Sequence, residues 1–371
     1  MTRIALVHDW LTGMRGGERA LEVICELAPD ADLFTMVYVP GTASPPIVAH
    51  RIRTTPLSFV PGIRHLYRHC LPLFPAAVEM FDLDDADLVI STSHCAAKAA
   101  VARPGARHLC YCFTPLRYAW DQFDEYFGRE RTGTLASVAL RAVLRRLARW
   151  DARTSARVSR YVAISHYVAG RIARYYNREA AVVYPPVDTA FFTPGSGQSE
   201  GYALIVSALV PYKRIDVAID AARLAGVPLK IIGQGPERPR LEARAQGTEV
   251  EFLGFQSDDA VRDAYRNAAL VMLPGEEDFG IVPVEAQACG RPVVALAAGG
   301  ARETVLDRIT GVLVDDASAE SLAEGLAAVN RLPFDPAVAR AHAESFSRQK
   351  FAAAIGRIIE ETATAPEGTR W

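Results

Sequence analysis

Two successive series of short apolar runs, each alternating with amphipathic stretches, constrain the fold of this chain more than any other feature. The first series starts at residues 3–8 and the second at residues 202–207. Between them, residues 189–201 are rich in Thr, Ser, Gly, Pro and Gln, as an interdomain linker is. Short apolar runs separated by helix-length segments are typical of buried parallel strands joined by helices. We therefore predict two α/β domains, residues 1–188 and residues 189–346.

Both series begin in the manner of nucleotide-binding domains. In the first, the strand at residues 3–8 leads through a loop, Asp9 to Gly16, into a helix from Gly17 to Leu27. Further strands are expected at 33–38, 88–92, 108–113 and 161–165 in the first domain, and at 202–207, 229–232, 250–254, 269–273 and 292–296 in the second. Neither series carries the G-x-G-x-x-G fingerprint, which disfavours a dinucleotide-dependent oxidoreductase.

Composition narrows the functional classes. The net charge of −2 gives no sign of nucleic-acid binding, and no run of 18 uncharged apolar residues predicts a membrane span. The N-terminus enters a strand directly, without the pattern of a signal peptide. We expect reduced, mostly buried thiols and a cytoplasmic protein, because neither a redox motif nor a zinc-ligand pattern joins the six cysteines, Cys25, Cys70, Cys95, Cys110, Cys112 and Cys289.

The stretch from Pro274 to Pro292 combines an acidic, Gly-containing loop with a short helix. The helix is expected to start near Ile281, with Pro283 in its first turn and Gly290 just past its end. It follows directly on a predicted strand, so its N-terminus should lie at the carboxyl edge of the sheet, where open α/β sheets bind their ligands.

Glu277 in this loop and Glu285, expected in the first helical turn, place two carboxylates around a helix N-terminus. Charge–dipole capping would account for one of them. It does not account for the loop Phe279–Ile281, which puts backbone N–H groups between the two acids. Backbone donors for an anion, with carboxylates on either side to accept from hydroxyls, suit a sugar nucleotide diphosphate.

Positive charge is predicted on the same rim. Lys213 and Arg214 lie in the loop after the first strand of the second domain, where fixed cations could stabilise a departing diphosphate. Gly16 and Gly17, at the first helix start, could let a phosphate or a sugar approach the backbone, although a tight turn alone would also explain them.

Residues 129–160 carry nine arginines, at positions 129, 131, 141, 145, 146, 149, 153, 157 and 160, against Glu130 and Asp151. Leu140, Val143, Leu144 and Leu147 recur at helical spacing, which predicts a basic amphipathic helix. Such a helix either binds an anionic membrane surface or packs on its own sheet with a solvated basic face. RNA binding is less favoured, since no aromatic platform accompanies it. Residues 59–81 mix Arg, His and aromatics with Leu and Pro, and predict poor core and a surface for an amphipathic partner.

With these motifs in place, the chain resembles the retaining glycosyltransferases of family 4, which have the GT-B fold, over nearly its whole length. The strongest match is the E-x7-E motif from Glu277 to Glu285. Supporting matches are G-G-E-R-A-L (16–21), P-P-V-D-T-A-F-F (185–192), V-P-Y-K-R (210–214) and G-Q-G-P (233–236). The H-D-W-L start (8–11) and Y-C-F-T-P-L-R-Y-A-W-D (111–121) resemble the mannosyltransferase-like members that build O-antigen and exopolysaccharide.

The resemblance implies two Rossmann-like domains facing a central cleft and a last helix, about 347–361, that packs back on the first domain together with the residues up to 371. It implies that Glu277 and the Phe279–Ile281 backbone hold the transferred hexose. Glu285 would hold the ribose, Lys213 the diphosphate, and Gly16–Gly17 would lie against phosphates and acceptor. The full donor-side set is Gly16, Gly17, Lys213, Arg214, Gly233, Asp278, Phe279, Gly280, Ile281 and Glu285.

Two positions depart from the family pattern. Phe113 stands where such transferases usually carry a His, and Ala208 where they usually carry an Arg. Arg214 is a candidate for the missing charge. Asp9, His8 and His94 are candidates for the missing polar group, with Asp9 placed among the catalytic residues and His94 and Phe113 on the acceptor side.

The implied reaction moves a hexose from a nucleotide sugar, with GDP-mannose as the preferred donor, to a hydroxyl of a lipid-linked glycan, with retained configuration and no metal or other cofactor. One alternative is a metal-dependent DxD transferase based on Asp82, Asp84, Asp85 and Asp87, although these acids precede a strand rather than follow one. The other is a degenerate protein of the same fold that binds sugars or membranes without catalysis, motivated by Phe113 and Ala208.

Overall fold

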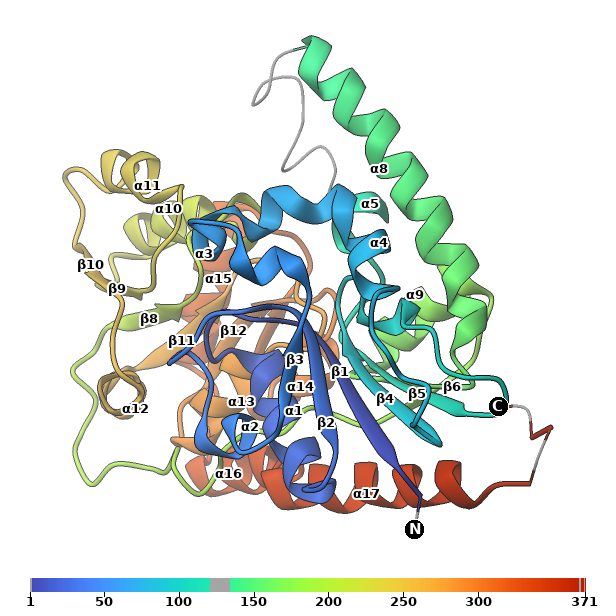
Figure 1. Cartoon of the computed structure of the whole chain (residues 1–371). Coiled ribbons are helices and arrows are strands. Elements are labelled where there is room, and N and C mark those ends of the chain that lie inside the picture. Colours follow the sequence, from blue (N-terminus) through green and yellow to red (C-terminus); the bar gives the residue numbers. More distant parts are fainter. Residues whose placement is uncertain (1, 121–133, 367, 370) are drawn as a thin grey trace. The chain divides into compact units, whose positions relative to one another are not determined.

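The computed structural model describes residues 2–120, 134–366, 368–369 and 371 (Figure 1). The chain forms two compact units. Unit 1 comprises Met1–Pro186 with Phe351–Trp371, and unit 2 comprises Val187–Lys350. Each unit contains one sheet whose strands all pair in parallel. This confirms the prediction of two Rossmann-like α/β domains.

The sheet of unit 1 has seven strands in the order β3-β2-β1-β4-β5-β6-β7. Their bounds are β1 Ile4–Leu11, β2 Asp32–Tyr38, β3 Ile52–Thr54, β4 Leu88–Ser93, β5 Arg107–Cys112, β6 Arg160–Ala163 and β7 Ala180–Val182. Strand β1 is central because it pairs with β2 on one side and β4 on the other, with Leu6 opposite both Leu33 and Ile90. The carboxyl ends of these strands therefore meet at one edge of the sheet.

Strand β1 is longer than the sequence pattern predicts. It continues through His8, Asp9 and Trp10 to Leu11, so Asp9 lies inside the strand rather than in a loop. All but the first residue of the strand are buried. Polar residues interrupt the apolar run, and the sequence pattern hides the true strand end for that reason.

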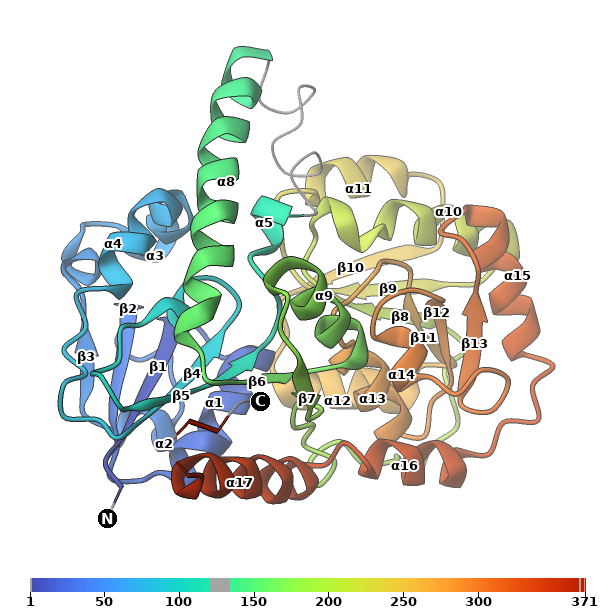
Figure 2. The same cartoon turned by 90° about the vertical axis from the view of Figure 1, so that its right-hand side faces the viewer.

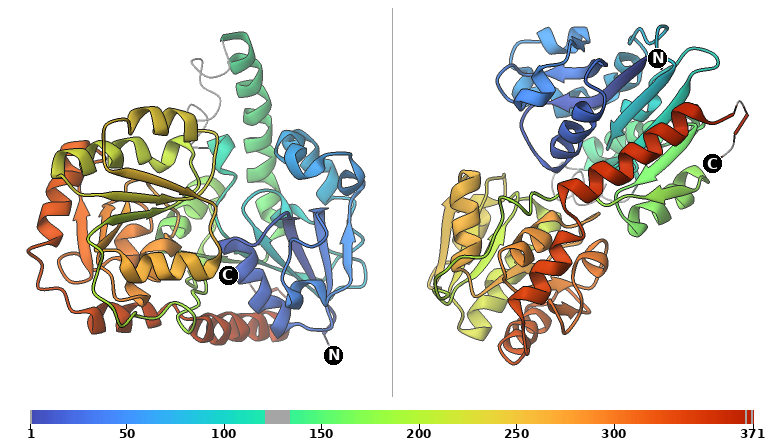
Figure 3. Two further views of the ribbon diagram at one scale, coloured as in Figure 1. Left: turned by 90° about the vertical axis from the view of Figure 1, so that its left-hand side faces the viewer. Right: turned by 90° about the horizontal axis from the view of Figure 1, so that it is seen from below.

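The helices of unit 1 are α1 Gly16–Leu27, α2 Pro45–Val48, α3 Ile63–Leu66, α4 Phe74–Val78, α5 Arg117–Trp120, α8 Thr134–Thr154, α9 His166–Tyr176 and α17 Arg348–Thr364. The short 3-10 turns are η1 Pro56–Phe59, η2 Tyr67–Leu73, η3 Ala97–Ala99 and η4 Ser155–Arg157. Ser165 caps α9 as predicted, since its hydroxyl accepts from the N–H of Val168 at 3.0 Å. Helix α17 lies along unit 1 (Figure 3), where the ring of Phe351 packs on that of Tyr111 at 5.4 Å.

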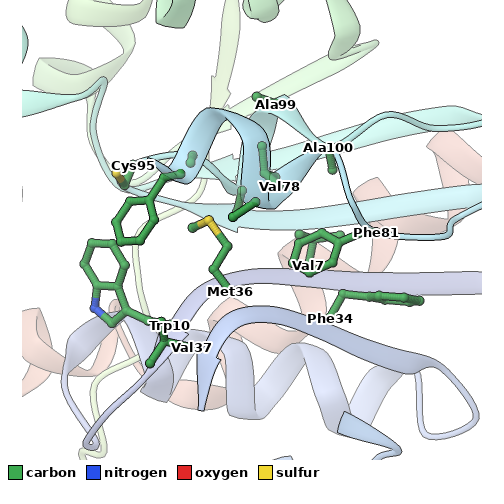
Figure 4. Packing of buried hydrophobic residues seen from close by; sticks show 14 of the residues in the cluster. Val7, Trp10, Phe34, Met36, Val37, Val78, Phe81, Cys95, Ala99 and Ala100 are labelled. Atoms are coloured by element: carbon green, nitrogen blue, oxygen red, sulfur yellow. The ribbon is translucent and has the colours of Figure 1, made fainter. Parts of the chain in front are cut away.

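Part of the expectation for residues 59–81 is wrong. Ile63, Tyr67, Phe74 and Val78 are buried in one cluster with residues of β1 and β2. Figure 4 shows this packing, with Val78 close to Met36 and Trp10 at the end of the cluster. The proline and histidine content conceals a core contribution because the short helices bury only every third or fourth residue. The side chains between them remain exposed.

The sheet of unit 2 has six strands in the order β10-β9-β8-β11-β12-β13. The strands are β8 Ala203–Val206, β9 Leu229–Ile232, β10 Val250–Gly254, β11 Leu270–Leu273, β12 Val293–Leu296 and β13 Gly311–Val314. The helical segments are η5 Pro211–Lys213, α10 Ile215–Ala225, α11 Arg238–Arg244, α12 Asp258–Asn267, α13 Ile281–Ala288, α14 Ala301–Thr304, α15 Ala319–Val329 and α16 Pro336–Glu344. Every strand predicted in this half is present within a residue or two of its expected bounds.

All six cysteines are free thiols, and all but Cys70 are buried, as predicted. Burial raises the pKa of the Cys25 thiol to about 12, which keeps it protonated and unreactive. Among the helices that the structure describes, none is both long enough and apolar enough to cross a bilayer.

Candidate functional site

Helix α13 begins at Ile281, as predicted, after Gly280 at a φ of 88°. Pro283 lies in its first turn and Gly290, at a φ of 74°, just past its end. Glu285 is the fifth residue of the helix, so it lies in the second turn rather than the first. The helix dipole acts mainly within the first turn. Capping therefore explains Glu285 less well than the sequence suggested, and its carboxylate has another partner.

That partner is Tyr265 on α12, a residue that sequence reasoning missed. Its hydroxyl donates to Oε2 of Glu285 at 2.8 Å, and the Tyr265 side chain is fully buried. Burial, and then the charge of Glu285, hold the pKa of the Tyr265 phenol well above its usual value, so the hydroxyl remains a donor. Tyr265 precedes Glu285 by 20 residues and lies in a different helix, so no local sequence pattern indicates this contact.

Lys213 and Glu277 form an ion pair between the loop after β8 and the loop after β11. Both side chains are mostly buried, with 13% and 20% of their areas exposed. The sequence placed the two residues on one rim, and the structure brings them into contact there. Nζ of Lys213 also lies 4.9 Å from the ring centre of its neighbour Tyr212.

Arg214 points away from this pair. It occupies the left-handed region, at a φ of 51°, where it begins α10. Its Nε lies 3.7 Å from Oδ1 of Asp216, and a terminal nitrogen donates to the carbonyl of Ala317 at 3.3 Å. These contacts give Arg214 a local role, while Ala208 nearby is exposed.

Glycines lock the loops at this edge of unit 2 together. A Cβ on Gly299 would lie 2.1 Å from the carbonyl oxygen of Glu277, and one on Gly300 would lie 2.3 Å from Cα of Phe279. Gly300 also donates its N–H to the Glu277 carbonyl at 2.8 Å. Similarly, a Cβ on Gly233 would lie 1.8 Å from the Ser207 carbonyl oxygen. These glycines are therefore required for loop-to-loop packing, whatever ligand approaches them.

The loop between β11 and α13 offers mainly its backbone. Asp278 and Phe279 are buried, and the Phe279 ring meets that of Phe346 edge-on at 5.6 Å. With this aromatic side chain directed into the core, the main chain of Phe279–Ile281 remains at the start of α13, as the motif requires for anion or hydroxyl binding.

In unit 1, Asp9 is fully buried and its carboxylate is engaged by backbone donors. One oxygen accepts from the N–H groups of Ala96 and Ala97, both at 2.7 Å. The other accepts from those of His94 and Cys95 at 2.7 and 2.9 Å. The carboxylate thus fixes the loop that follows β4.

His94 stands at the end of this loop. Its Nδ1 lies 3.2 Å from Oδ2 of Asp9, and its ring meets Trp10 edge-on at 4.4 Å. Burial is the largest influence on its imidazole and lowers its pKa below the usual 6.5, even though the Asp9 charge acts in the opposite direction. In its neutral form the imidazole retains a lone pair on one of its two ring nitrogens.

Phe113 and Gly17 are in close contact near His94. A Cβ on Gly17 would lie 3.3 Å from the Phe113 ring, and the centre of that ring is 6.2 Å from the centre of the His94 ring. Gly16 is the first residue of α1, so both glycines lie at its N-terminus. The structure therefore brings together the predicted Gly16–Gly17, His94 and Phe113.

His8, the third candidate for the missing polar group, is buried inside unit 1. Its Nδ1 is 2.7 Å from the hydroxyl of Thr92, and its Nε2 is 4.0 Å from Oε1 of Glu18. Burial acts to raise the pKa of Glu18, but the polar and charged groups around it, with His8 first among them and Arg15 contributing, lower that pKa. Because His8 is fully buried, it supports the start of α1 from within the core.

Two acids of the DxD alternative, Asp85 and Asp87, form surface ion pairs. Oδ1 of Asp85 lies 3.1 Å from a guanidinium nitrogen of Arg3, and Asp87 contacts Arg103 and accepts from the Arg3 N–H at 2.8 Å. They precede β4, at the amino end of the sheet. Among the described residues, no group of three His, Cys, Asp or Glu side chains is arranged to hold a metal ion.

Comparison with known proteins agrees with this architecture. Residues 14–191 match the profile of Glycosyltransferase Family 4, and residues 187–360 match that of Glycosyl transferases group 1. The D-inositol 3-phosphate glycosyltransferase of Mycolicibacterium smegmatis is 34% identical over 200 residues, covering 48% of this chain and 46% of the relative. An uncharacterized glycosyltransferase of Methanocaldococcus jannaschii is 30% identical over 170 residues, covering 44% of this chain and 47% of the relative. The chain thus spans about half the length of the curated relatives it matches.

Solved structures resemble the whole chain. HepE of Anabaena, solved with UDP and glucose, has a TM-score of 0.69 at 19% identity and covers 99% of this chain and 100% of its own. The lipopolysaccharide outer core galactosyltransferase WaaB has a TM-score of 0.66 at 17% identity, with coverages of 97% and 99%. The shared fold defines the class, a two-domain glycosyltransferase of the GT-B type. Because the two profiles together span residues 14–360, the chain belongs to the group 1, family 4 glycosyltransferases.

Proposed function

We propose that this protein transfers a hexose from a nucleotide diphosphate sugar to a hydroxyl of a lipid-linked glycan, with retention of configuration, in the synthesis of a cell-surface polysaccharide. The contact between Lys213 and Glu277 is the observation that carries the proposal. It joins a cation suited to a diphosphate and a carboxylate suited to sugar hydroxyls at the carboxyl edge of one parallel sheet.

Donor binding would exchange this ion pair for ligand contacts. The diphosphate takes Lys213, and the hexose hydroxyls donate to Glu277 and contact the Phe279–Ile281 backbone. Glu285, oriented by Tyr265, accepts from the ribose hydroxyls. The N-terminus of α13 adds a favourable field for the anion. These groups supply the charge stabilisation that the departing diphosphate needs, so the proposal includes no metal.

The proposed chemistry takes place on one face of the sugar. The bond from the anomeric carbon to the diphosphate oxygen breaks, and the acceptor oxygen bonds to that carbon from the same side. The departing phosphate takes the proton of the acceptor hydroxyl, so no protein nucleophile is required. Both Glu277 and Glu285 remain hydroxyl acceptors throughout.

His94 is proposed as the acceptor-side group in place of the absent His at position 113. Asp9 orients its ring through Nδ1, and Phe113 with Gly17 forms the adjacent surface. A neutral imidazole can accept a hydrogen bond from a sugar hydroxyl through Nε2. In this scheme Asp9 acts as a positioning residue, because backbone donors already engage its carboxylate.

Donor identity is best tested by thermal shift against GDP-, UDP- and ADP-sugars, with GDP-mannose the donor favoured by the sequence motifs. HepE, by contrast, was solved with UDP and glucose, so UDP-sugars are the main comparison. The stabilising donor is then supplied in radiolabelled form to the wild type and to Glu277→Ala. Unchanged donor turnover in the variant would disprove the assignment of Glu277.

A non-catalytic sugar-binding protein of the same fold is the second candidate, favoured by Phe113 and by the exposed Ala208 in place of the two usual polar residues. The same radiolabel experiment distinguishes it from an enzyme. In this experiment the acceptors are supplied as a lipid extract. If the donor stabilises the protein but is neither hydrolysed nor transferred, the result supports this candidate over the transferase.

A further inference from the structure

Helix α8 presents a basic face that carries no exposed acid. Arg141, Arg145, Arg146, Arg149 and Arg153 are exposed along the helix, and we call them the basic face of α8. Its only acid, Asp151, is buried and paired with Lys98 at 3.0 Å. Val138 and Val143, in the first half of the helix, are also exposed. The start of the helix stands away from the rest of unit 1 in Figures 1 and 2. Arg129 and Arg131 lie outside the described residues.

The other end of α8 is firmly anchored. Asp151 accepts from Nε1 of Trp120 and from the hydroxyl of Tyr176, both at 2.8 Å. Nζ of Lys98 donates to the Asp151 carbonyl at 2.7 Å and lies 4.7 Å from the centre of the Tyr176 ring. This buried network links α8 to α5 and α9, so the basic face is held on a rigid support. The predicted packing on its own sheet therefore coexists with an exposed basic face.

The exposed side chains of residues 56–80 form a second feature of unit 1. Phe59 is 81% exposed, and Leu66, Leu73 and Met80 are each more than two-fifths exposed; we call these four residues the apolar rim. Exposed Arg64, His65, Arg68 and His69 lie between them in sequence. The one acid of this segment, Glu79, pairs with Arg157 at 2.6 Å.

The two features lie at the same end of unit 1. Phe74 and Val78 of α4 share a buried cluster with Leu144 and Leu147 of α8. Figures 1 and 2 both show α4 beside α8. Large exposed apolar side chains flanked by arginines are the combination that binds an anionic bilayer: arginines attract the headgroups while apolar side chains enter the interface.

We propose that the basic face of α8 and the apolar rim together form one docking surface for an anionic lipid bilayer. This deepens the proposed function by naming how the enzyme reaches a lipid-linked acceptor. Arginine contacts alone would give binding that salt abolishes, whereas the apolar rim would leave a salt-resistant component. A single-stranded RNA would need a series of aromatic stacking platforms, whereas Phe59 is the one aromatic side chain of the apolar rim.

Vesicle flotation with the full chain tests the proposal. The wild type should bind phosphatidylcholine vesicles containing about one-third phosphatidylglycerol, and not phosphatidylcholine alone. Arg145→Gln with Arg149→Gln should weaken binding about twenty-fold, from roughly fivefold per arginine. Phe59→Ser with Leu73→Ser should weaken it roughly tenfold and remove the salt-resistant component.

Matched controls come from exposed residues of unit 2. Phe255 is 77% exposed and Leu224 is 60% exposed. The double variant Phe255→Ser with Leu224→Ser therefore removes a similar apolar area, but from unit 2. Arg308→Gln with Arg331→Gln removes the same charge as the α8 variant. Both control variants should bind like the wild type. Losses equal to those of the test variants, or tighter binding to single-stranded RNA than to vesicles, would overturn the proposal.

A tryptophan at position 59 provides a second measurement that does not depend on loss of function. The emission of the new tryptophan is obtained by subtracting the wild-type spectrum from that of the variant. For Phe59→Trp this difference spectrum should shift to the blue on anionic vesicles, and for Phe255→Trp it should not. An unshifted Phe59→Trp on vesicles that bind the protein would overturn insertion of the apolar rim. Donor binding measured by thermal shift without vesicles tests the proposed function separately, so either proposal can fail alone.

Discussion

The hydroxyl of Tyr265 donates a hydrogen bond to Oε2 of Glu285 at 2.8 Å from a fully buried position. This contact fixes one oxygen of the carboxylate that the E-x7-E motif assigns to the donor ribose. Tyr265 touches no part of the proposed reaction itself. It is therefore a positioning residue, and its loss should affect donor affinity more than turnover.

Tyr265→Phe should raise the donor KM about fivefold with little change in kcat, because a net hydrogen bond of roughly 1 kcal/mol is lost from the binding geometry. Tyr202→Phe is the matched control, since its hydroxyl donates to the Ala264 carbonyl of the same helix at 2.8 Å without touching Glu285. Steady-state kinetics distinguish the two. Equal KM values in both variants would argue against the positioning role.

Lys213 and Glu277 should behave as one unit. Lys213→Met and Glu277→Gln should each lower kcat/KM by roughly a hundredfold or more, as removal of one charge-stabilising group does. Because the side chains are in contact, the double variant should lose far less than the product of the two effects, with a coupling of about 2 kcal/mol. Arg214→Gln should have a small effect, since Arg214 faces Asp216 and Ala317. Strict additivity would mean that the pair does not share a ligand.

The sequence was sufficient to predict the two-domain fold and the position of helix α13. Strands β8 to β12 and helix α13 could be predicted because buried parallel strands are continuously apolar and helix ends carry Pro and Gly. The short edge strands β3 and β7 and the last strand β13 were missed. The placement of Lys213 and Glu277 on one rim followed from the rule that loops after parallel strands share one edge, but their contact was not predicted.

The remaining features depend on long-range packing that no local pattern encodes. Tyr265 reaches Glu285 from a different helix, and Asp9 engages backbone groups more than 80 residues away in the chain. Gly233 was assigned to the donor side, yet a Cβ on it would meet the carbonyl of Ser207 in a neighbouring loop. Local sequence indicates that another group packs closely against a glycine, but it does not identify that group.

Gly300→Ala should abolish donor binding without unfolding unit 2. Gly300 has a φ of −71°, which suits any residue, so the effect is purely steric: the new methyl would lie 2.3 Å from Cα of Phe279. The loop bearing Glu277 and Phe279 must then move. Gly170→Ala, where a Cβ meets nothing within 4 Å, is the tolerated control. Thermal shift with donor measures both, and a donor response in Gly300→Ala like that of the wild type would contradict the loop-locking role.

Asp9 and His94 should separate stability from activity. Asp9→Ala removes the acceptor of four backbone N–H groups and should cost roughly 3 kcal/mol or more, lowering the Tm of unit 1 by about 6–12 °C. His94→Gln should leave Tm nearly unchanged and lower the transfer rate at least tenfold through the acceptor KM. A large Tm loss in His94→Gln, or full activity with the acceptor, would contradict the acceptor-side role.

Acid should destabilise unit 1 through His108. Burial, and then the charge of Lys98, lower the pKa of this imidazole from 6.5 to about 3. The unfolded chain therefore binds the proton more readily than the folded one between these values. Stability from the neutral ring is fully present above pH 6.5 and is lost as pH falls toward 3, by about 1.4 kcal/mol per pH unit.

His108→Gln keeps a donor for Ser91, which lies 2.8 Å from Nε2, but cannot be protonated. Its unfolding free energy should therefore fall less steeply, by about 2 kcal/mol between pH 6.5 and about pH 5, in denaturant titrations followed by fluorescence. Parallel pH profiles for the variant and the wild type would show that another group controls the acid transition.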